Sequence, residues 1–136
     1  MREIEFRLRS LKTKKVIGYE CLWDNGWAES GDGVNWQPLA RSVLALREQF
    51  TGFKDKNGQE IYEGDIVKTH DEDMIADIEV GEVYMSKYGF WAIKDDFEDE
   101  LGIESYTYVG DGTGKRKNCG MEVIGNIYEN PELLKK

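Results

Sequence analysis

The first segment of the chain alternates apolar and charged residues. Ile4, Phe6 and Leu8 are spaced two apart, and side chains two residues apart lie on the same face of a β-strand. The residues between and around them are charged, namely Glu3, Glu5, Arg7 and Arg9. The pattern predicts a half-buried strand with one apolar and one charged face.

A second strand is predicted directly after a polar turn. Residues Val16–Trp23 are rich in β-branched and aromatic side chains, which favour strands. They follow the polar segment Lys12–Lys15. We therefore expect the first two strands to form an N-terminal β-hairpin.

The next segment, Asp24–Pro38, has glycines among Asp, Asn and Ser residues, a composition that favours repeated turns. We interpret it as an ordered loop or short hairpin. Its expected anchors are Trp23, Trp27 and Trp36. Residues Leu39–Phe50 are ambiguous, because their apolar positions have helical spacing although the segment could also extend into a strand. A helix is the favoured interpretation.

The stretch FTGFKDKNGQEIYEGDIVK, Phe50–Lys68, combines two chain reversals with an apolar run. Asn57-Gly58 predicts a type I′ hairpin turn, which needs positive φ at both central residues. The same residues do not match a calcium loop, which needs a glycine at its sixth position and a glutamate at its twelfth. A second reversal is expected at Glu63-Gly64-Asp65, before a strand that begins with the buried pair Ile66-Val67.

Four further β-type runs follow, separated by acidic or glycine-rich turns. They are residues 75–83, 88–93, 106–109 and 122–128. Such regular spacing predicts a mainly β fold, a small barrel or a sandwich with few short helices. Asn130 is a suitable N-cap and Pro131 suits the first helical position, so a short C-terminal turn of helix is expected.

Three stretches resemble the phage and prophage YopX-like family: REIEFR near the N-terminus, the Phe50–Lys68 stretch, and EVIGNIYENPELL at Glu122–Leu134. The resemblance implies a small protein encoded in phage or prophage genomes, whose C-terminal part is similar to an SH3-type barrel. We expect residues 1–49 to form a β-hairpin and loop region, packed as one unit with a barrel region at residues 50–136. The residues of the family signature are Gly52, Asp55, Asn57, Gly58, Tyr62, Gly64, Asp65, Gly125, Asn126, Tyr128, Asn130 and Pro131.

The charge balance changes the range of expected partners. The 136 residues carry 27 acidic and 18 basic side chains, a formal charge of −9, and such a field repels phosphate backbones and favours basic partners. Nucleic acid is therefore a disfavoured partner, although an acidic surface could also mimic DNA. With no apolar targeting segment and no run of 18 apolar residues, the sequence predicts a cytoplasmic protein without a membrane span.

No set of residues makes up a complete active site. The run Gly110–Lys115 has Val109 and Arg116 where a phosphate loop needs glycine and a hydroxyl, so Lys115, Arg116 and Lys117 are kept as a possible contact for an anion or a partner. His70 is the only histidine, and no nucleophile motif accompanies it or Cys119. The acidic groups at 71–73 and 95–100 have the composition of ordinary turns as well as of a metal site. No cofactor and no metal are expected.

The favoured hypothesis is a non-enzymatic accessory protein that binds other proteins. We expect a homo-oligomer and a host or phage protein as partner, because aromatic residues that reach the surface would form an interaction patch. The alternative is a nucleic-acid-associated protein or an acidic DNA mimic that modulates a host enzyme. A third hypothesis, a metal-assisted hydrolase, would use His70 and nearby carboxylates.

Overall fold

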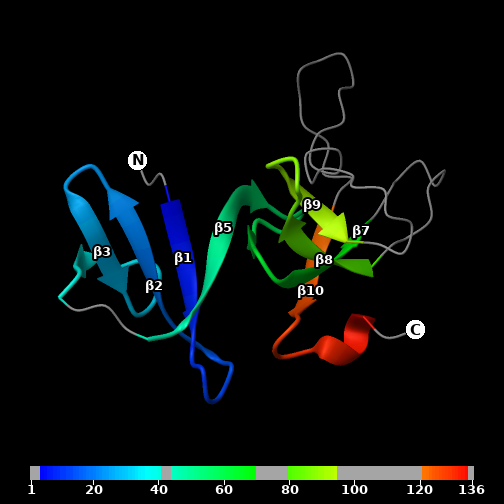
Figure 1. Ribbon diagram of the computed structural model, residues 1–136, viewed down its shortest axis with the longest axis horizontal. Helices are drawn as coiled ribbons and strands as arrows, with labels where there is room; N and C mark the ends of the chain where they lie inside the picture. The colour runs from blue at the N-terminus through cyan, green and yellow to red at the C-terminus, as the bar shows by residue number, and fades with distance from the viewer. Residues whose placement is uncertain (1–3, 41–43, 70–79, 95–120, 135–136) are drawn as a thin grey trace, which may run out of the picture. The chain divides into compact units, whose positions relative to one another are not determined.

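The computed structural model describes residues 4–40, 44–69, 80–94 and 121–134 (Figure 1). Within these ranges the protein is mainly β, with antiparallel sheets and a single short 3-10 helix. The contacts of the chain divide it into two compact units, Met1–Phe50 and Thr51–Lys136. Each unit is described by itself.

The first unit is an antiparallel sheet with the strand order β4-β3-β2-β1-β5. Its strands are β1 (Ile4–Arg9), β2 (Val16–Trp23), β3 (Gly26–Ser30), β4 (Gln37–Pro38) and the first part of β5 (Leu46–Lys54). The predicted N-terminal hairpin is confirmed, because β1 pairs with β2 from Ile4↔Leu22 onward. The short hairpin expected between 24 and 38 is confirmed by the pairing of β3 with β4.

The helix predicted for residues 39–50 is wrong where the structure describes this segment. Residues from Leu46 onward form β5, which pairs with the free side of β1 through Arg9↔Leu46 and Phe6↔Gln49. Backbone pairing with β1 outweighs the helical spacing of the apolar residues, as tertiary context commonly overrides local propensity.

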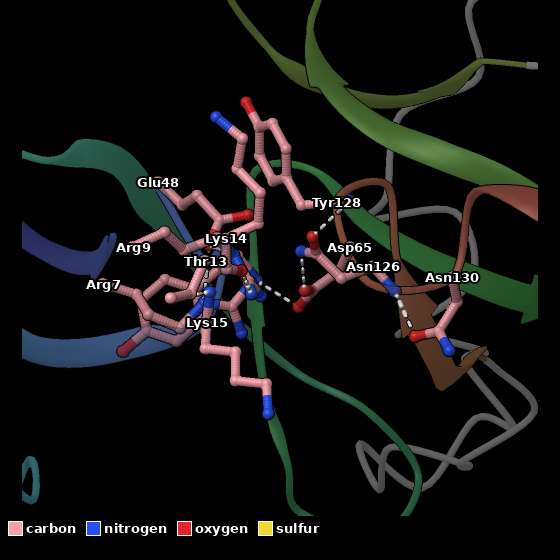
Figure 2. Close-up of polar contacts among 11 residues, drawn as sticks. Arg7, Arg9, Thr13, Lys14, Lys15, Glu48, Asp65, Asn126, Tyr128 and Asn130 are labelled. Atoms are coloured by element: carbon pink, nitrogen blue, oxygen red, sulfur yellow. Dashed lines mark hydrogen bonds and ion pairs between the residues drawn. The ribbon is translucent and has the colours of Figure 1, made fainter. Parts of the chain in front are cut away.

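The charged face of β1 is buried, which corrects the expectation of a half-buried strand. Glu5, Arg7 and Arg9 are all buried, and Arg9 has only 1% of its surface exposed. The neighbouring strand β5 makes this burial possible by bringing Glu48 opposite Arg7. The Nε atoms of Arg7 and Arg9 both donate to Oε1 of Glu48, at 2.9 and 2.5 Å (Figure 2). Buried charges in proteins need such partners.

A second ion pair crosses β1 on the other face of the sheet. Arg47 donates from Nε and Nη2 to the two carboxylate oxygens of the buried Glu20, at 3.2 and 3.1 Å. This two-bond geometry is the stronger form of an arginine–carboxylate contact. The sheet of the first unit therefore carries arginine–glutamate pairs on both faces of β1.

The second unit contains an antiparallel sheet with the order β10-β7-β8-β9, and the second part of β5 pairs with β6. The bounds of these strands are β6 (Glu60–Tyr62), β7 (Asp65–Thr69), β8 (Val80–Met85), β9 (Trp91–Lys94) and β10 (Met121–Asn126). Their inward side chains form one hydrophobic core, made of Ile61, Val67, Val83, Ile93 and Met121. The predicted buried start of the strand at Ile66-Val67 is confirmed.

The turn between β5 and β6 differs from the type I′ turn that Asn57-Gly58 predicted. Gly58 has a φ of 83°, but Asn57 does not have positive φ. The amide of Gly58 donates to the carbonyl of Asp55, and the amide of Asp55 donates to the carbonyl of Gln59. This arrangement is a turn followed by a glycine in the left-handed region, the pattern of a three-residue hairpin loop.

The carboxylate of Asp55 is the reason for this turn. Its Oδ1 accepts hydrogen bonds from the amides of Asn57 and Gln59, at 2.8 and 2.9 Å. Its Oδ2 accepts a third from the amide of Val123 in β10, at 3.0 Å. One buried side chain thus closes the loop and fixes it to a strand that is distant in sequence.

A second polar cluster joins the Gly64 corner to the C-terminal segment (Figure 2). Gly64 has a φ of 87°, and Asp65 accepts from the amide of Tyr62 at 2.9 Å and from Nδ2 of Asn126 at 3.2 Å. The side chain of Asn130 in turn accepts from the amide of Asn126. The 3-10 helix η1 (Pro131–Leu134) follows, which confirms the short C-terminal helical turn.

Replacing Gly125 by alanine is expected to destabilise the second unit by about 2 kcal/mol, the typical cost of overpacking. A Cβ at this position would lie 2.7 Å from Cδ1 of Leu133 and 2.9 Å from Cβ of Asn130. Urea unfolding of Gly125→Ala measures the effect. The matched control is Gly31→Ala, because a Cβ at Gly31 meets nothing within 4 Å. Equal stability of the two variants would contradict the close approach of η1 to β10.

Several expectations lie outside the described residues or remain predictions. His70, Cys119 and the acidic groups at 71–73 and 95–100 lie outside them, as does the β-type run at 106–109. An SH3-type barrel stays a prediction, because the segments that connect β7 to β8 and β9 to β10 also lie outside the described residues. In the described part of the chain, no helix is long and apolar enough to cross a membrane.

Candidate functional site

Three tryptophans of the first unit line a surface pocket. Trp23 ends β2, Trp27 lies in β3, and Trp36 directly precedes β4. The ring centroids of Trp23 and Trp36 are 6.2 Å apart, with the ring planes tilted by 51°. Trp23 and Trp27 are 38% and 42% exposed, an unusual exposure for such large apolar side chains. The remaining lining residues are Asn25, Gly26, Ala28, Gln37 and Pro38.

The register of the β2–β3 hairpin keeps the pocket open. Trp23 pairs with Gly26 across a two-residue turn, and directly paired residues in an antiparallel ladder share one face of the sheet. Because Gly26 has no side chain, and a Cβ there would meet nothing within 4 Å, the paired position leaves open space beside the indole of Trp23. Trp27 lies on the other face, where its ring stacks on Phe6 with 6.1 Å between centroids. Ala28 and Pro38, also a direct pair, add small apolar walls.

Asp32 organises the loop that leads to Trp36. Its Oδ1 accepts hydrogen bonds from the amides of Val34 and Asn35 and from the hydroxyl of Ser30, at 2.8, 2.8 and 2.9 Å. Its Oδ2 accepts from Nδ2 of Asn35 at 2.7 Å. The hydrogen bonds from the Asn35 and Val34 amides, with those from the two side chains, hold the pKa of Asp32 well below its ordinary value. The loop therefore keeps its ionised carboxylate at neutral and mildly acidic pH.

The pocket suits one small, flat or compact group. Its volume is about 140 Å³, close to the roughly 150 Å³ of an engineered cavity that holds benzene. Trp23 and Trp36 give it aromatic surface, Ala28 and Pro38 are aliphatic, and Asn25 and Gln37 are its polar lining residues. Apolar walls with a few polar groups are typical of binding sites.

The charge around the pocket is acidic. Residues 16–40 contain four carboxylates and no lysine, arginine or histidine. Glu20 is paired with Arg47, so Asp24, Glu29 and Asp32 carry the negative charge of this segment. The basic turn Lys12–Lys15 lies at the opposite end of β2, roughly 25 Å away at about 3.3 Å per strand residue. A ligand beside Trp23 therefore meets an indole face and the negative charge of the adjacent, exposed Asp24.

The residues predicted as a possible anion or partner contact, Lys115, Arg116 and Lys117, lie outside the described residues. The family signature residues lie in the second unit, and those with described hydrogen bonds stabilise backbone turns and strand ends. Asp55, Asp65, Asn126 and Asn130 each accept hydrogen bonds from backbone amides. In the described ranges, no three His, Cys, Asp or Glu side chains gather closely enough to hold a metal ion.

The pocket was only partly predictable from the sequence. The three tryptophans were expected as anchors of the 24–38 segment. Nothing in their spacing indicated that the rings of Trp23 and Trp36 would lie close together at the edge of a pocket. The available signal was that the tryptophans occur close to glycine and proline in a stretch of sequence without basic residues. The buried ion pairs of β1 gave no comparable signal.

Comparison with protein-family profiles identifies the family of this chain. The profile described as YopX protein matches residues 6–135. The chain belongs to the YopX protein family. Among solved structures, the protein is similar to protein EF1440 from Enterococcus faecalis, with 23% sequence identity and a TM-score of 0.50 over 99% of this chain and 100% of that one. This likeness shows a common fold. Comparison with curated proteins gives no significant match.

Proposed function

We propose that this YopX protein works by binding another protein through the tryptophan pocket, without catalysing a reaction. The observation that carries the proposal is the exposed Trp23 and the half-buried Trp36 tilted against it beside a pocket of the first unit. Tryptophan is enriched among the residues that dominate binding energy at protein interfaces. A sheet edge closed by only two residues of β4 gives a partner access to the pocket.

The setting of this activity follows from the family resemblance and the composition. We propose an accessory protein of a phage or prophage that acts in the bacterial cytoplasm. Self-association is a second mode of the same activity, in which another copy of the chain occupies the pocket. The second unit is proposed as an SH3-type barrel, in which signature residues such as Asp55 and Asp65 hold turns and strand ends together.

Selection with random displayed peptides tests the proposal. The immobilised full chain is expected to enrich a set of related peptides, and Trp23→Ala is expected to weaken their binding at least thirtyfold, the effect of losing an interface residue worth about 2 kcal/mol. Light scattering over a concentration series tests self-association in parallel. The exposed position of Trp23 makes a folded variant the expected outcome, and circular dichroism checks this.

Tyr88→Ala is the matched control, because Tyr88 is a 71% exposed aromatic residue of the second unit. It is expected to leave peptide binding unchanged. A chain that enriches no peptide above the Trp23→Ala background and stays monomeric at every concentration would overturn the proposal. Peptides bound equally well by the wild type and by Trp23→Ala would overturn the assignment of the pocket.

A further inference from the structure

We propose that the tryptophan pocket binds an arginine side chain of the protein partner. The inference rests on the proposed function and adds the chemistry of the bound group. A guanidinium is planar, stacks on aromatic faces and is more weakly hydrated than an ammonium. These properties match a small aromatic pocket at an acidic surface.

The ring geometry favours a flat cation that lies against the indole faces. With 6.2 Å between centroids and a tilt of 51°, Trp23 and Trp36 form an open wedge. A group inserted between two parallel rings needs roughly 7 Å, twice the contact distance of about 3.5 Å between carbon atoms. The ligand is therefore placed in the mouth of the wedge, over both rings. Cations are attracted to such positions because the face of an aromatic ring is electronegative, most strongly for tryptophan.

Asn25 at the rim supplies a hydrogen-bond acceptor for the guanidinium. It lies in the turn between Trp23 and Gly26 and is among the lining residues. Gln37 also borders the pocket, but its Nε2 donates to Oε1 of Glu29 at 3.4 Å on the face of the sheet that carries Trp27. Arginine carries five N–H donors in a fixed plane, so it can stack on an indole and donate to a rim oxygen at once.

The negative charge near the pocket favours a positively charged ligand. Asp24 is exposed and adjacent to Trp23, and Asp32 lies in the loop that leads to Trp36. No lysine, arginine or histidine occurs in residues 16–40 to bind a carboxylate or a phosphate. Like charges raise the cost of an acidic ligand, whereas a basic one is attracted. The second unit contains the same type of contact, with Nζ of Lys87 5.1 Å from the ring centroid of Tyr88.

The test is a titration of the full chain, followed by the indole Nε1–H signals of Trp23 and Trp36 in nuclear magnetic resonance spectra. The probes are capped peptides Gly-Ser-Xaa-Ser-Gly with arginine, citrulline, leucine or glutamate at Xaa. Citrulline has the shape of arginine without its charge. We expect saturable shifts with the arginine peptide and at least tenfold weaker binding of the other three. Trp36→Phe, which keeps an aromatic face, should bind the arginine peptide more tightly than Trp36→Leu.

The outcomes separate this inference from the proposed function. If peptides from the random selection bind at the pocket but the citrulline or leucine probe equals the arginine probe, the pocket docks proteins and the arginine assignment is wrong. If the glutamate probe binds best, the assignment of charge is wrong. If neither the selected peptides nor any probe shifts the two indole signals, then the proposal of protein binding at the pocket and the proposal of arginine binding are both wrong. The comparison of probes uses the wild type, so it does not depend on whether a variant folds.

Discussion

Asp55→Ala is expected to lower the free energy of unfolding of the second unit by about 4 kcal/mol. The carboxylate accepts three backbone hydrogen bonds, from Asn57, Gln59 and Val123. Hydrogen bonds to charged groups each contribute about 1.5 kcal/mol or more, and a buried amide left without its acceptor adds a penalty. Because small domains are stable by only about 5–15 kcal/mol, the variant should lose a large share of its stability. Urea unfolding followed by circular dichroism measures the loss.

Two further variants make this prediction specific to the carboxylate. Asp55→Asn keeps one acceptor oxygen but places an NH₂ group where the other oxygen accepts a bond, so we expect about 2 kcal/mol of destabilisation. Asp24→Ala, in an exposed turn, should change stability by less than about 0.5 kcal/mol. An Asp55→Ala variant as stable as Asp24→Ala would show that the turn and β10 are held together without this side chain.

The signature stretch shows what local sequence can and cannot predict. The reversal at Asn57-Gly58, the corner at Gly64 and the buried start of the following strand follow from turn and strand propensities, and all are present. The type of the first turn was wrong, because the side chain of Asp55 supplies hydrogen bonds that the dipeptide rule does not consider. The contact of Asp55 with Val123 joins residues 68 positions apart, which no local pattern reveals.

The first unit shows a different limit. Alternation located β1 and propensity located β2, but the burial of the charged face of β1 could not be predicted, because alternation looks the same whether the charges meet water or partners. The partner Glu48 lies in a segment whose apolar spacing favoured a helix. For the candidate site, the sequence identified the tryptophans only as anchors of the 24–38 segment. The position of Trp23 depends on its pairing with Gly26, and that of Trp36 on the loop that Asp32 holds.

Glu48→Leu is expected to destabilise the first unit by about 3–5 kcal/mol, the usual effect of removing one partner of a buried ion pair. The substitution leaves the guanidinium groups of Arg7 and Arg9 in the position where both now donate to Oε1 of Glu48. The side chains of Arg9 and Glu48 are only 1% and 4% exposed, so solvent does little to replace the carboxylate. Urea unfolding followed by tryptophan fluorescence measures the effect. Glu29→Leu is the control, because its carboxylate accepts only an exposed, 3.4 Å bond from Gln37 among the described contacts, and should cost less than about 0.5 kcal/mol.

Removing the three charges that meet at the Glu48 carboxylate should be much less harmful than removing Glu48 alone. The triple variant Arg7→Met, Arg9→Met, Glu48→Leu takes away all three charges together and is expected to lie within about 2 kcal/mol of the wild type, because apolar replacement of a buried ionic cluster is often neutral or stabilising. Arg9 also donates from Nη1 to the carbonyl of Lys14 at 2.8 Å, and the loss of this bond should account for part of any remaining difference. Such a result would mean that the attraction between the three charges roughly offsets the free-energy cost of burying them. The ion pairs would then add little net stability. A triple variant less stable than Glu48→Leu would instead show that the ion pairs themselves hold β5 against β1.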